Sequence, residues 1–325
     1  MDYQQDFQPN DSPSDHDKLL KALIKASITV FFVCLYVARY LEVVLNNPSS
    51  FDDGTQDELI VHYVKLYTEN LRLPFGVPPS PPYLSFLECI SILSVMMSLQ
   101  PVRIYIHTNM NFIWPANSCR KWVTKWPPFH IVYSPLRKTI GSQNISIIHH
   151  EADLRKLEAV RRYGGLFIDF DVLVLDGKEI RRQLAAHPCI ICDENNPVMH
   201  SQSKVNAGFF GCLRPNAEFP RRILQESYEE DYQAAEWTYN SGVKPTEILE
   251  KHPGMAVYVD GVCNNPSWRS KRRLNGDSWS EKMAFHHFTE TDNFLDEQHL
   301  AASNTRPLKD VVYFICARAN VSCDA

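Results

Sequence analysis

Residues 144–175 read NISIIHHEADLRKLEAVRRYGGLFIDFDVLVL and carry most of the information about the fold. Apolar side chains recur every three residues in the first half, at Leu154, Leu157, Val160 and Tyr163. This spacing predicts a helix with one apolar face over about 151–163, ended by Gly164 and Gly165. The apolar run at 166–175 then predicts a buried strand.

Two carboxylates, Asp169 and Asp171, stand two residues apart within this run, so a continuous strand would point both to one face. A carboxylate among apolar side chains is costly to desolvate unless a cation meets it, and two on one face repel each other. Oxygen ligands in an open site suit Mg²⁺ or Mn²⁺, which also bind substrate phosphates. The pattern therefore predicts a divalent cation and a phosphorylated ligand. In the alternative interpretation, the strand ends at Ile168 and both aspartates are ordinary turn residues.

The rest of the chain alternates strand-like and helix-like stretches. Helices are expected around 83–99, 151–163 and 217–239, and strands at 102–107, 129–134, 166–175, 189–192, 205–213 and 255–261. This alternation predicts an α/β fold with a mixed, mostly parallel sheet. In such sheets the ligand site lies at the carboxyl ends of the strands.

Composition excludes several classes of protein. The 325 residues include 33 Lys and Arg against 38 Asp and Glu, a net charge of −5 with no basic block. Nucleic acid is therefore not expected as a partner, because phosphate backbones require a positive surface. With 44% hydrophobic residues the chain can bury a sizeable core and is not disordered. The excess negative charge comes from residues 1–17, which we expect to be a disordered tail.

The sequence of the next segment, residues 18–45, predicts a membrane-anchor helix. Three lysines, Lys18, Lys21 and Lys25, precede an uncharged run at 26–38, which is shorter than the about 20 residues that a spanning helix needs. The charge bias places the tail in the cytosol and the bulk of the chain across the membrane. The alternative is an amphipathic helix packed on a soluble domain. Residues 46–82 end in PFGVPPSPP and are interpreted as a Pro-rich stem, which leaves 83–325 as the main domain.

The cysteines favour an oxidising compartment. Of nine, Cys34 lies in the uncharged run, and the other eight are Cys89, Cys119, Cys189, Cys192, Cys212, Cys263, Cys316 and Cys323. This even set could form disulfides. The Cys189-x-x-Cys192 motif could instead be a redox pair or half of a zinc site. Glycosylation sequons begin at Asn144 and Asn320.

The order Asp153, Gly164-Gly165 and Asp169-x-Asp171 resembles the sugar-nucleotide-binding region of glycosyltransferase family 32. This DXD-containing family includes α-1,4-galactosyltransferase-like, α-1,4-N-acetylglucosaminyltransferase-like and mannosyltransferase-like enzymes. The resemblance implies a single GT-A (Rossmann-type) domain, a nucleotide-sugar donor bridged by Mn²⁺ or Mg²⁺, and a glycan or glycolipid acceptor. It also implies retention of anomeric configuration and, in animals, a single-pass type II protein of the Golgi membrane with its catalytic domain in the lumen.

The resemblance also implies roles for individual residues. Asp171 would ligate the metal, and Asp169 would contact the ribose or the metal through water. Asp153 would hydrogen-bond hydroxyls of the donor sugar. Lys156 stands where the family usually has Arg, and its point charge cannot make the planar two-bond grip of a guanidinium.

Six further residues match more weakly or stand at strand ends. His107 and Asn206 are candidates for donor binding, and His286 or His287 for the metal. The acidic pair Asp193 and Glu194 is nominated for the acceptor side, with an ordinary loop role as the alternative.

Two other functions fit parts of the pattern. LFIDFDV also resembles the first motif of haloacid-dehalogenase-like phosphatases, in which Asp169 would attack phosphorus and Asp171 would act as the acid-base group. The departure at Lys156 keeps open a glycan-binding, non-catalytic transferase homologue.

Overall fold

A computed structural model of the chain describes residues 58–67, 83–110, 114–115, 129–194, 204–259, 278–287 and 306–323. They belong to one compact unit, Gln56–Ala325. The expected tail at 1–17 and the anchor at 18–45 lie outside the described residues. Within the described part, no helix has the length and apolar character needed to cross a membrane.

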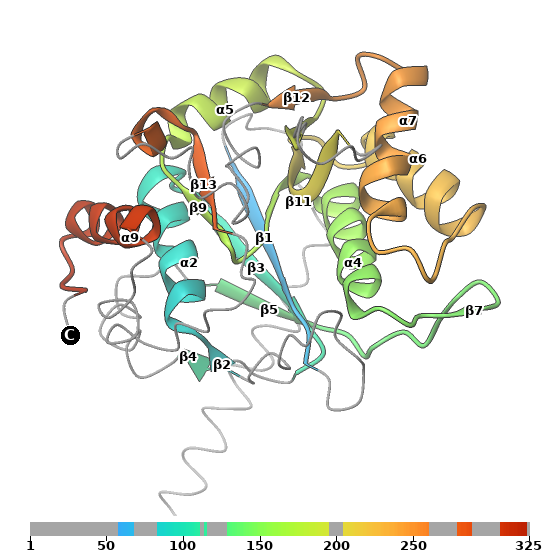
Figure 1. The fold of residues 1–325 in the computed structure, drawn as a ribbon, viewed down its shortest axis with the longest axis horizontal. Coiled ribbons are helices and arrows are strands. Elements are labelled where there is room, and N and C mark those ends of the chain that lie inside the picture. Colours follow the sequence, from blue (N-terminus) through green and yellow to red (C-terminus); the bar gives the residue numbers. More distant parts are fainter. Residues whose placement is uncertain are drawn as a thin grey trace, which may run out of the picture. The chain divides into compact units, whose positions relative to one another are not determined.

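The core of this unit is a seven-stranded sheet with the strand order β12-β10-β11-β8-β1-β3-β5. Figure 1 labels β1, β3, β5, β11 and β12 of this sheet. Its strands are β1 (Ile60–Lys65), β3 (Arg103–Thr108), β5 (Phe129–Tyr133), β8 (Gly165–Ile168), β10 (Ile190–Asp193), β11 (Val205–Cys212) and β12 (Val257–Val259). Strand β11 runs antiparallel to both of its neighbours, and the other neighbouring pairs are parallel. The expected α/β fold with a mixed, mostly parallel sheet is confirmed.

Strand β1 is an interior strand of this sheet, between β8 and β3. Its Val61 and Tyr63 side chains are fully buried in the core. The stem interpretation of 46–82 is therefore wrong for residues 60–65, and the domain does not begin at residue 83. The prolines that follow this strand suggested a stem, but a short β-branched run such as IVHYVK can be a buried strand in a parallel sheet.

Helices cover the two faces of the sheet. Helices α2 (Phe86–Ser98), α5 (Gly177–Ala186) and α9 (Arg306–Ala319) contribute to one apolar core. Helices α4 (Ile148–Tyr163), α6 (Glu218–Arg222) and α7 (Lys244–Lys251), with the π-helix η3 (Ile223–Glu229), contribute to the other. The shorter elements are β2 (Tyr83–Leu84), β4 (Trp114–Pro115), β6 (Thr139–Ile140), β7 (Gln143–Asn144), β9 (Val172–Val174), β13 (Ala284–His286), η4 (Tyr239–Val243) and η6 (Ser278–Glu281).

The two glycines after α4 are required by the backbone. Gly164 and Gly165 have φ values of 68° and 96°, a region that other residues rarely adopt. A Cβ atom would lie 2.3 Å from the carbonyl oxygen of Leu213 at the first position and 2.4 Å from that of Ile60 at the second. Glycine here lets α4 turn directly into β8 and pack closely on the sheet.

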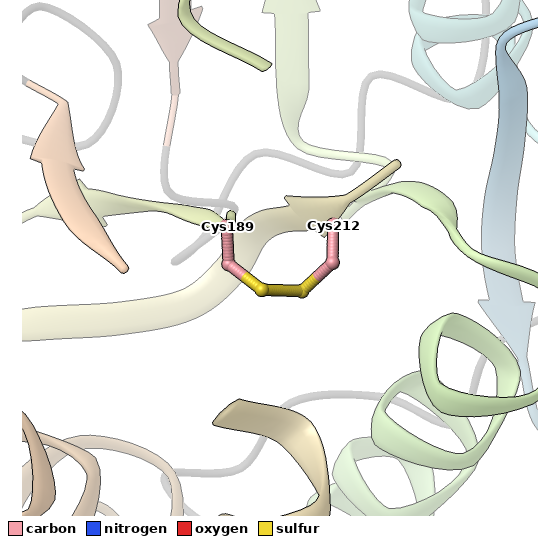
Figure 2. The surroundings of a disulfide bond; sticks show 2 residues. All are labelled: Cys189 and Cys212. Atoms are coloured by element: carbon pink, nitrogen blue, oxygen red, sulfur yellow. A yellow bond between two sulfur atoms is a disulfide. The ribbon is translucent and has the colours of Figure 1, made fainter. Parts of the chain in front are cut away.

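All six cysteines among the described residues are in disulfides. Cys189 and Cys212 join the start of β10 to the end of β11 (Figure 2). A second disulfide links Cys316 and Cys323 at the end of α9. Because Cys189 is bonded to Cys212, and Cys192 is itself disulfide-bonded, the Cys189-x-x-Cys192 motif is neither a redox pair nor half of a zinc site.

Candidate active site

The two aspartates lie in a turn at the carboxyl end of β8. The turn is closed by a hydrogen bond from the Val172 amide to the Asp169 carbonyl (3.0 Å), and the Asp169 amide donates to the Gly208 carbonyl (2.7 Å). The expectation of one continuous strand over 166–175 is therefore wrong. A turn at the sheet edge keeps both carboxylates out of the sheet interior, where desolvation would be most costly. Asp169 and Asp171 are nevertheless not ordinary turn residues, because each has a cationic partner.

The partner of Asp169 is Lys156, which helix α4 carries on the side facing the turn. The Lys156 Nζ lies 2.9 Å from Asp169 Oδ1 and 3.0 Å from Asp153 Oδ1. Asp153 and Lys156 are buried, at 5% and 6% exposed. Burial alone would lower the pKa of Lys156, but the charges of Asp169 and Asp153 raise it above its usual value. One ammonium group thus bridges the helix and the turn and compensates two carboxylates.

The partner of Asp171 comes from the carboxyl-terminal part of the chain. Strand β13 pairs antiparallel with β9, which places His286 opposite Val172. The His286 Nε2 lies 3.1 Å from Asp171 Oδ2. Burial disfavours both charged forms, yet the His286 charge lowers the pKa of Asp171 and the Asp171 charge raises that of His286. Of the two candidate histidines, His286 therefore faces the aspartate, whereas His287 donates its amide to the Asp171 carbonyl at 2.9 Å.

Strand β11 and the end of β10 complete the cluster. The Asn206 Oδ1 accepts a hydrogen bond from the Gly208 amide at 2.6 Å, and a Cβ on Gly208 would lie 2.8 Å from both Asn206 Oδ1 and Asp169 Oδ2. Asn206 also hydrogen-bonds Glu194, whose pKa is raised by burial and which senses the charge of His286. Asn206 and Glu194 are thus neighbours of the two aspartates.

Two predicted residues lie elsewhere. Asp193 pairs with Val205 and therefore lies on the opposite side of the strands from Asn206, and its charge acts on Tyr258 of β12. His107 lies on the α4 side of the sheet, where its Nε2 is 3.1 Å from Nδ1 of His62. Burial lowers the pKa of His107, and the charges of His62 and Arg155 lower it further. No described contact joins His107 to the aspartates, so the structure does not add it to the cluster.

Two functional candidates were missed by the sequence reasoning. His149 precedes Asp153 by four residues and Lys156 by seven, which places all three on one face of α4. Trp237 packs against the His149 ring, with 4.2 Å between ring centroids. The helical spacing could have identified His149. Nothing in the sequence links Trp237 to it across 88 positions, since the contact arises from folding.

The residues present fit a divalent cation at Asp171 and His286. Neighbouring ligands of an octahedral ion at about 2.1 Å are about 3 Å apart, close to the separation of these two side chains. Asp169 would not ligate the cation directly, because both of its carboxylate oxygens contact Lys156. The described segments contain no cluster of three or more His, Cys, Asp or Glu that could hold a metal, so water and substrate oxygens would complete the coordination.

Comparisons with known proteins give one distant relative. The chain is 24% identical over 204 residues to Glucan organizing enzyme 1 of Cryptococcus neoformans var. grubii, a match that covers 59% of this chain. The match spans 50% of that relative's length, about half of the curated protein. No protein-family model matches the chain, so membership of family 32 stays a prediction.

Several solved structures show weak similarity. PaToxG glycosyltransferase matches with a TM-score of 0.37 and 11% identity, covering 82% of this chain and 80% of its own. Mouse xyloside xylosyltransferase 1 matches with a TM-score of 0.38 and 9% identity, covering 62% and 85%. The galactosyltransferase LgtC matches with a TM-score of 0.33 and 13% identity, covering 62% and 73%. All three TM-scores are below 0.5, and the case for function therefore depends on the geometry of the site.

Proposed function

We propose that this protein is a metal-dependent glycosyltransferase that moves a sugar from a nucleotide-sugar donor to a hydroxyl group of a glycan or glycolipid, with retention of configuration. The observation that carries the proposal is the bridge by which Lys156 joins Asp153 to Asp169, beside the pair of Asp171 and His286. These groups meet at the carboxyl end of β8, the edge where open α/β sheets bind ligands. The name of the fungal relative, a glucan organizing enzyme, is compatible with carbohydrate chemistry.

Each group has a distinct role in this proposal. Asp171 and His286 would hold Mn²⁺, with Mg²⁺ as the alternative, and the bound ion would neutralise charge on the departing diphosphate. Asp153 would accept hydrogen bonds from donor-sugar hydroxyls, with its carboxylate oriented by Lys156. The Lys156 ammonium would also reduce the repulsion between the diphosphate and Asp169.

The other side of the cluster would orient the sugar. The Asn206 amide, fixed by the Gly208 amide, would face the donor sugar close to Asp169. Glu194 is the member of the nominated acidic pair that reaches the site, and its half-buried carboxylate would accept a hydrogen bond from an acceptor hydroxyl. Asp193 has no role in this proposal because it lies on the opposite side of the strand.

The test is release of nucleoside diphosphate from a panel of sugar nucleotides by the purified protein. Release should require Mn²⁺ or Mg²⁺, stop on addition of EDTA, and fall at least about a hundredfold in Asp171→Asn. Asp176→Asn is the matched control. Asp176 is the N-cap of α5, and Asn caps a helix as well as Asp does, so this variant should keep full activity.

The competing functions give different results in the same experiment. Metal-dependent phosphate release from a phosphomonoester, without diphosphate release, would support the phosphatase. Lys156 contacts both Asp169 oxygens, so one of these contacts would have to be given up before that oxygen could attack phosphorus. A folded protein that binds glycans but releases neither product would support the non-catalytic homologue.

The compartment is also part of the proposal. Placement in the Golgi lumen, with an anchor at 18–45, is a prediction from the sequence. The disulfides at Cys189–Cys212 and Cys316–Cys323 support an oxidising compartment. Asn144 and Asn320 are exposed, as glycosylation of their sequons would require.

A further inference from the structure

The segment at 231–238, here called the Trp237 loop, connects η3 to η4 and is held by the chain that leads into α4. Three of its backbone carbonyls accept hydrogen bonds from side chains at 143–150. Gln143 donates to the Tyr232 carbonyl at 2.9 Å. Ser146 donates to the Ala234 carbonyl at 2.7 Å, and Nε2 of His150 to the Glu236 carbonyl at 3.1 Å. Side-chain hydrogen bonds thus hold the irregular backbone of the loop at every second residue on this side.

The start of η4 fixes the Trp237 loop from the other side. The fully buried Asn240 side chain donates to the Gln233 carbonyl (3.0 Å) and accepts from the Gln233 amide (3.1 Å). Asp231 accepts hydrogen bonds from the Tyr239 hydroxyl (2.7 Å) and from Lys244 (2.9 Å). So many polar side chains committed to one short loop indicate that its conformation is specified rather than incidental.

The loop presents Trp237 beside the candidate active site. The half-buried Trp237 packs on His149, with 44° between the ring planes. His149 lies in the first turn of α4, about 6 Å along the helix from Asp153 and about 10 Å from Lys156. Burial lowers the pKa of His149 to about 4, and its ring also senses the charges of Asp153, Lys156 and Asp171. The two rings are therefore a neutral aromatic surface adjoining the charged cluster.

The order of groups along α4 separates two kinds of binding surface. Lys156 contacts the aspartate turn, Asp153 comes one turn earlier, and His149 with Trp237 lies one turn beyond that. The diphosphate of a donor needs the charged end, and its sugar would lie at Asp153. A sugar ring bound next to it would meet His149 and Trp237. Aromatic rings bind the apolar C–H face of a pyranose by dispersion, and a rigid loop loses little entropy on binding.

We propose that Trp237, supported by His149, is the binding surface for a pyranose ring of the acceptor glycan. The assignment to the acceptor, rather than to carbohydrate in general, rests on the proposed transferase function. The loop's hydrogen bonds preorganise Trp237, and His149 sets its distance from Asp153.

The test measures binding of methyl glucoside, galactoside, mannoside and xyloside to the full-length protein by saturation-transfer NMR and calorimetry. At least one glycoside should bind the wild type. Trp237→Ala should weaken that binding about tenfold, and Trp237→Phe, which keeps a flat ring, less than about threefold. Trp237→Leu keeps apolar volume without a flat face and should behave like Trp237→Ala. Tyr258→Ala removes an exposed aromatic side chain from β12 and should leave binding unchanged.

Two results would overturn the assignment. One is a wild-type protein, shown to be folded by its thermal transition, that binds none of the glycosides. The other is a glycoside affinity that Trp237→Ala leaves unchanged in a variant with a wild-type thermal midpoint.

Failure of the transferase proposal would look different. If the protein binds glycosides through Trp237 but releases no nucleoside diphosphate, the sugar site is supported and the transferase proposal is wrong. Diphosphate release combined with glycoside binding that does not depend on Trp237 would support the transferase proposal and overturn the sugar site at Trp237.

Discussion

The ammonium nitrogen of Lys156 lies 2.9 Å from Oδ1 of Asp169 and thereby joins α4 to the turn after β8. Lys156→Met keeps the length of the side chain but leaves Asp153 and Asp169 without this counter-charge. Breaking a buried ion pair from one side is strongly destabilising, so we expect a loss of about 3 kcal/mol in the free energy of unfolding. Urea denaturation at neutral pH measures it.

A matched variant separates charge from shape at this position. Lys156→Arg keeps the positive charge and can reach both carboxylates with its fork, so it should recover most of the stability lost in Lys156→Met. If Lys156→Met is as stable as the wild type, the bridge contributes nothing to the fold and its role as a link between helix and turn is wrong.

Gly208 lies where a side chain would collide with the candidate site. In Gly208→Ala the new methyl group would push against the Asn206 and Asp169 oxygens, each 2.8 Å away. Because these are side-chain tips, the fold should lose only about 1 kcal/mol, whereas displaced site groups should lower diphosphate release at least tenfold. The thermal midpoint and the rate, measured on one preparation, distinguish the two effects. A fully active Gly208→Ala protein would show that Asn206 and Asp169 need not keep their present positions.

Metal binding can be measured without turnover. Titration of Mn²⁺, followed by electron paramagnetic resonance of the free ion, should show one site that weakens at least tenfold in both Asp171→Asn and His286→Ala. His252→Ala, at the carboxyl end of α7, is the control and should bind like the wild type. Unchanged affinity in both site variants would place the ion elsewhere.

The buried imidazole of His62 should make stability depend on pH. Its Nε2 donates to the Gly164 carbonyl at 2.8 Å, and its Nδ1 accepts from His107 at 3.1 Å, so both nitrogens of the neutral ring are hydrogen-bonded. Burial lowers the pKa of His62 to about 4, from 6.5 in the unfolded chain. The unfolded state therefore binds the proton first as the pH falls. The stability that the neutral ring contributes is present above about pH 6.5 and is lost progressively toward pH 4.

The corresponding measurement is the free energy of unfolding at pH 7 and at pH 5. His62 should account for a loss of about 2 kcal/mol between them, and His62→Gln should lose correspondingly less over the same interval. Parallel pH profiles for the two proteins would mean that His62 does not carry this dependence.

Local pattern was sufficient for much of the fold. The three-residue apolar spacing before Gly164 predicted α4, and apolar runs predicted β3, β5, β10, β11 and β12 near their observed positions. These features are local, because helix periodicity and β-branched runs depend on neighbours in the chain. The same reasoning failed for β1, whose short run IVHYVK stands before a Pro-rich stretch, and for the break after Ile168, where a hydrogen bond from the Val172 amide to the Asp169 carbonyl closes a turn inside the apolar run.

The sequence by itself determined the α/β class, the Gly164-Gly165 transition and the presence of Asp153, Lys156, Asp169 and Asp171 near one strand end. Only the tertiary structure decided that Lys156 compensates both Asp153 and Asp169, that His286 rather than His287 faces Asp171, and that Glu194 but not Asp193 reaches the site. The physical reason is distance along the chain. A carboxylate in an apolar run requires a cation, but which cation it meets depends on how strands more than 100 residues apart are paired.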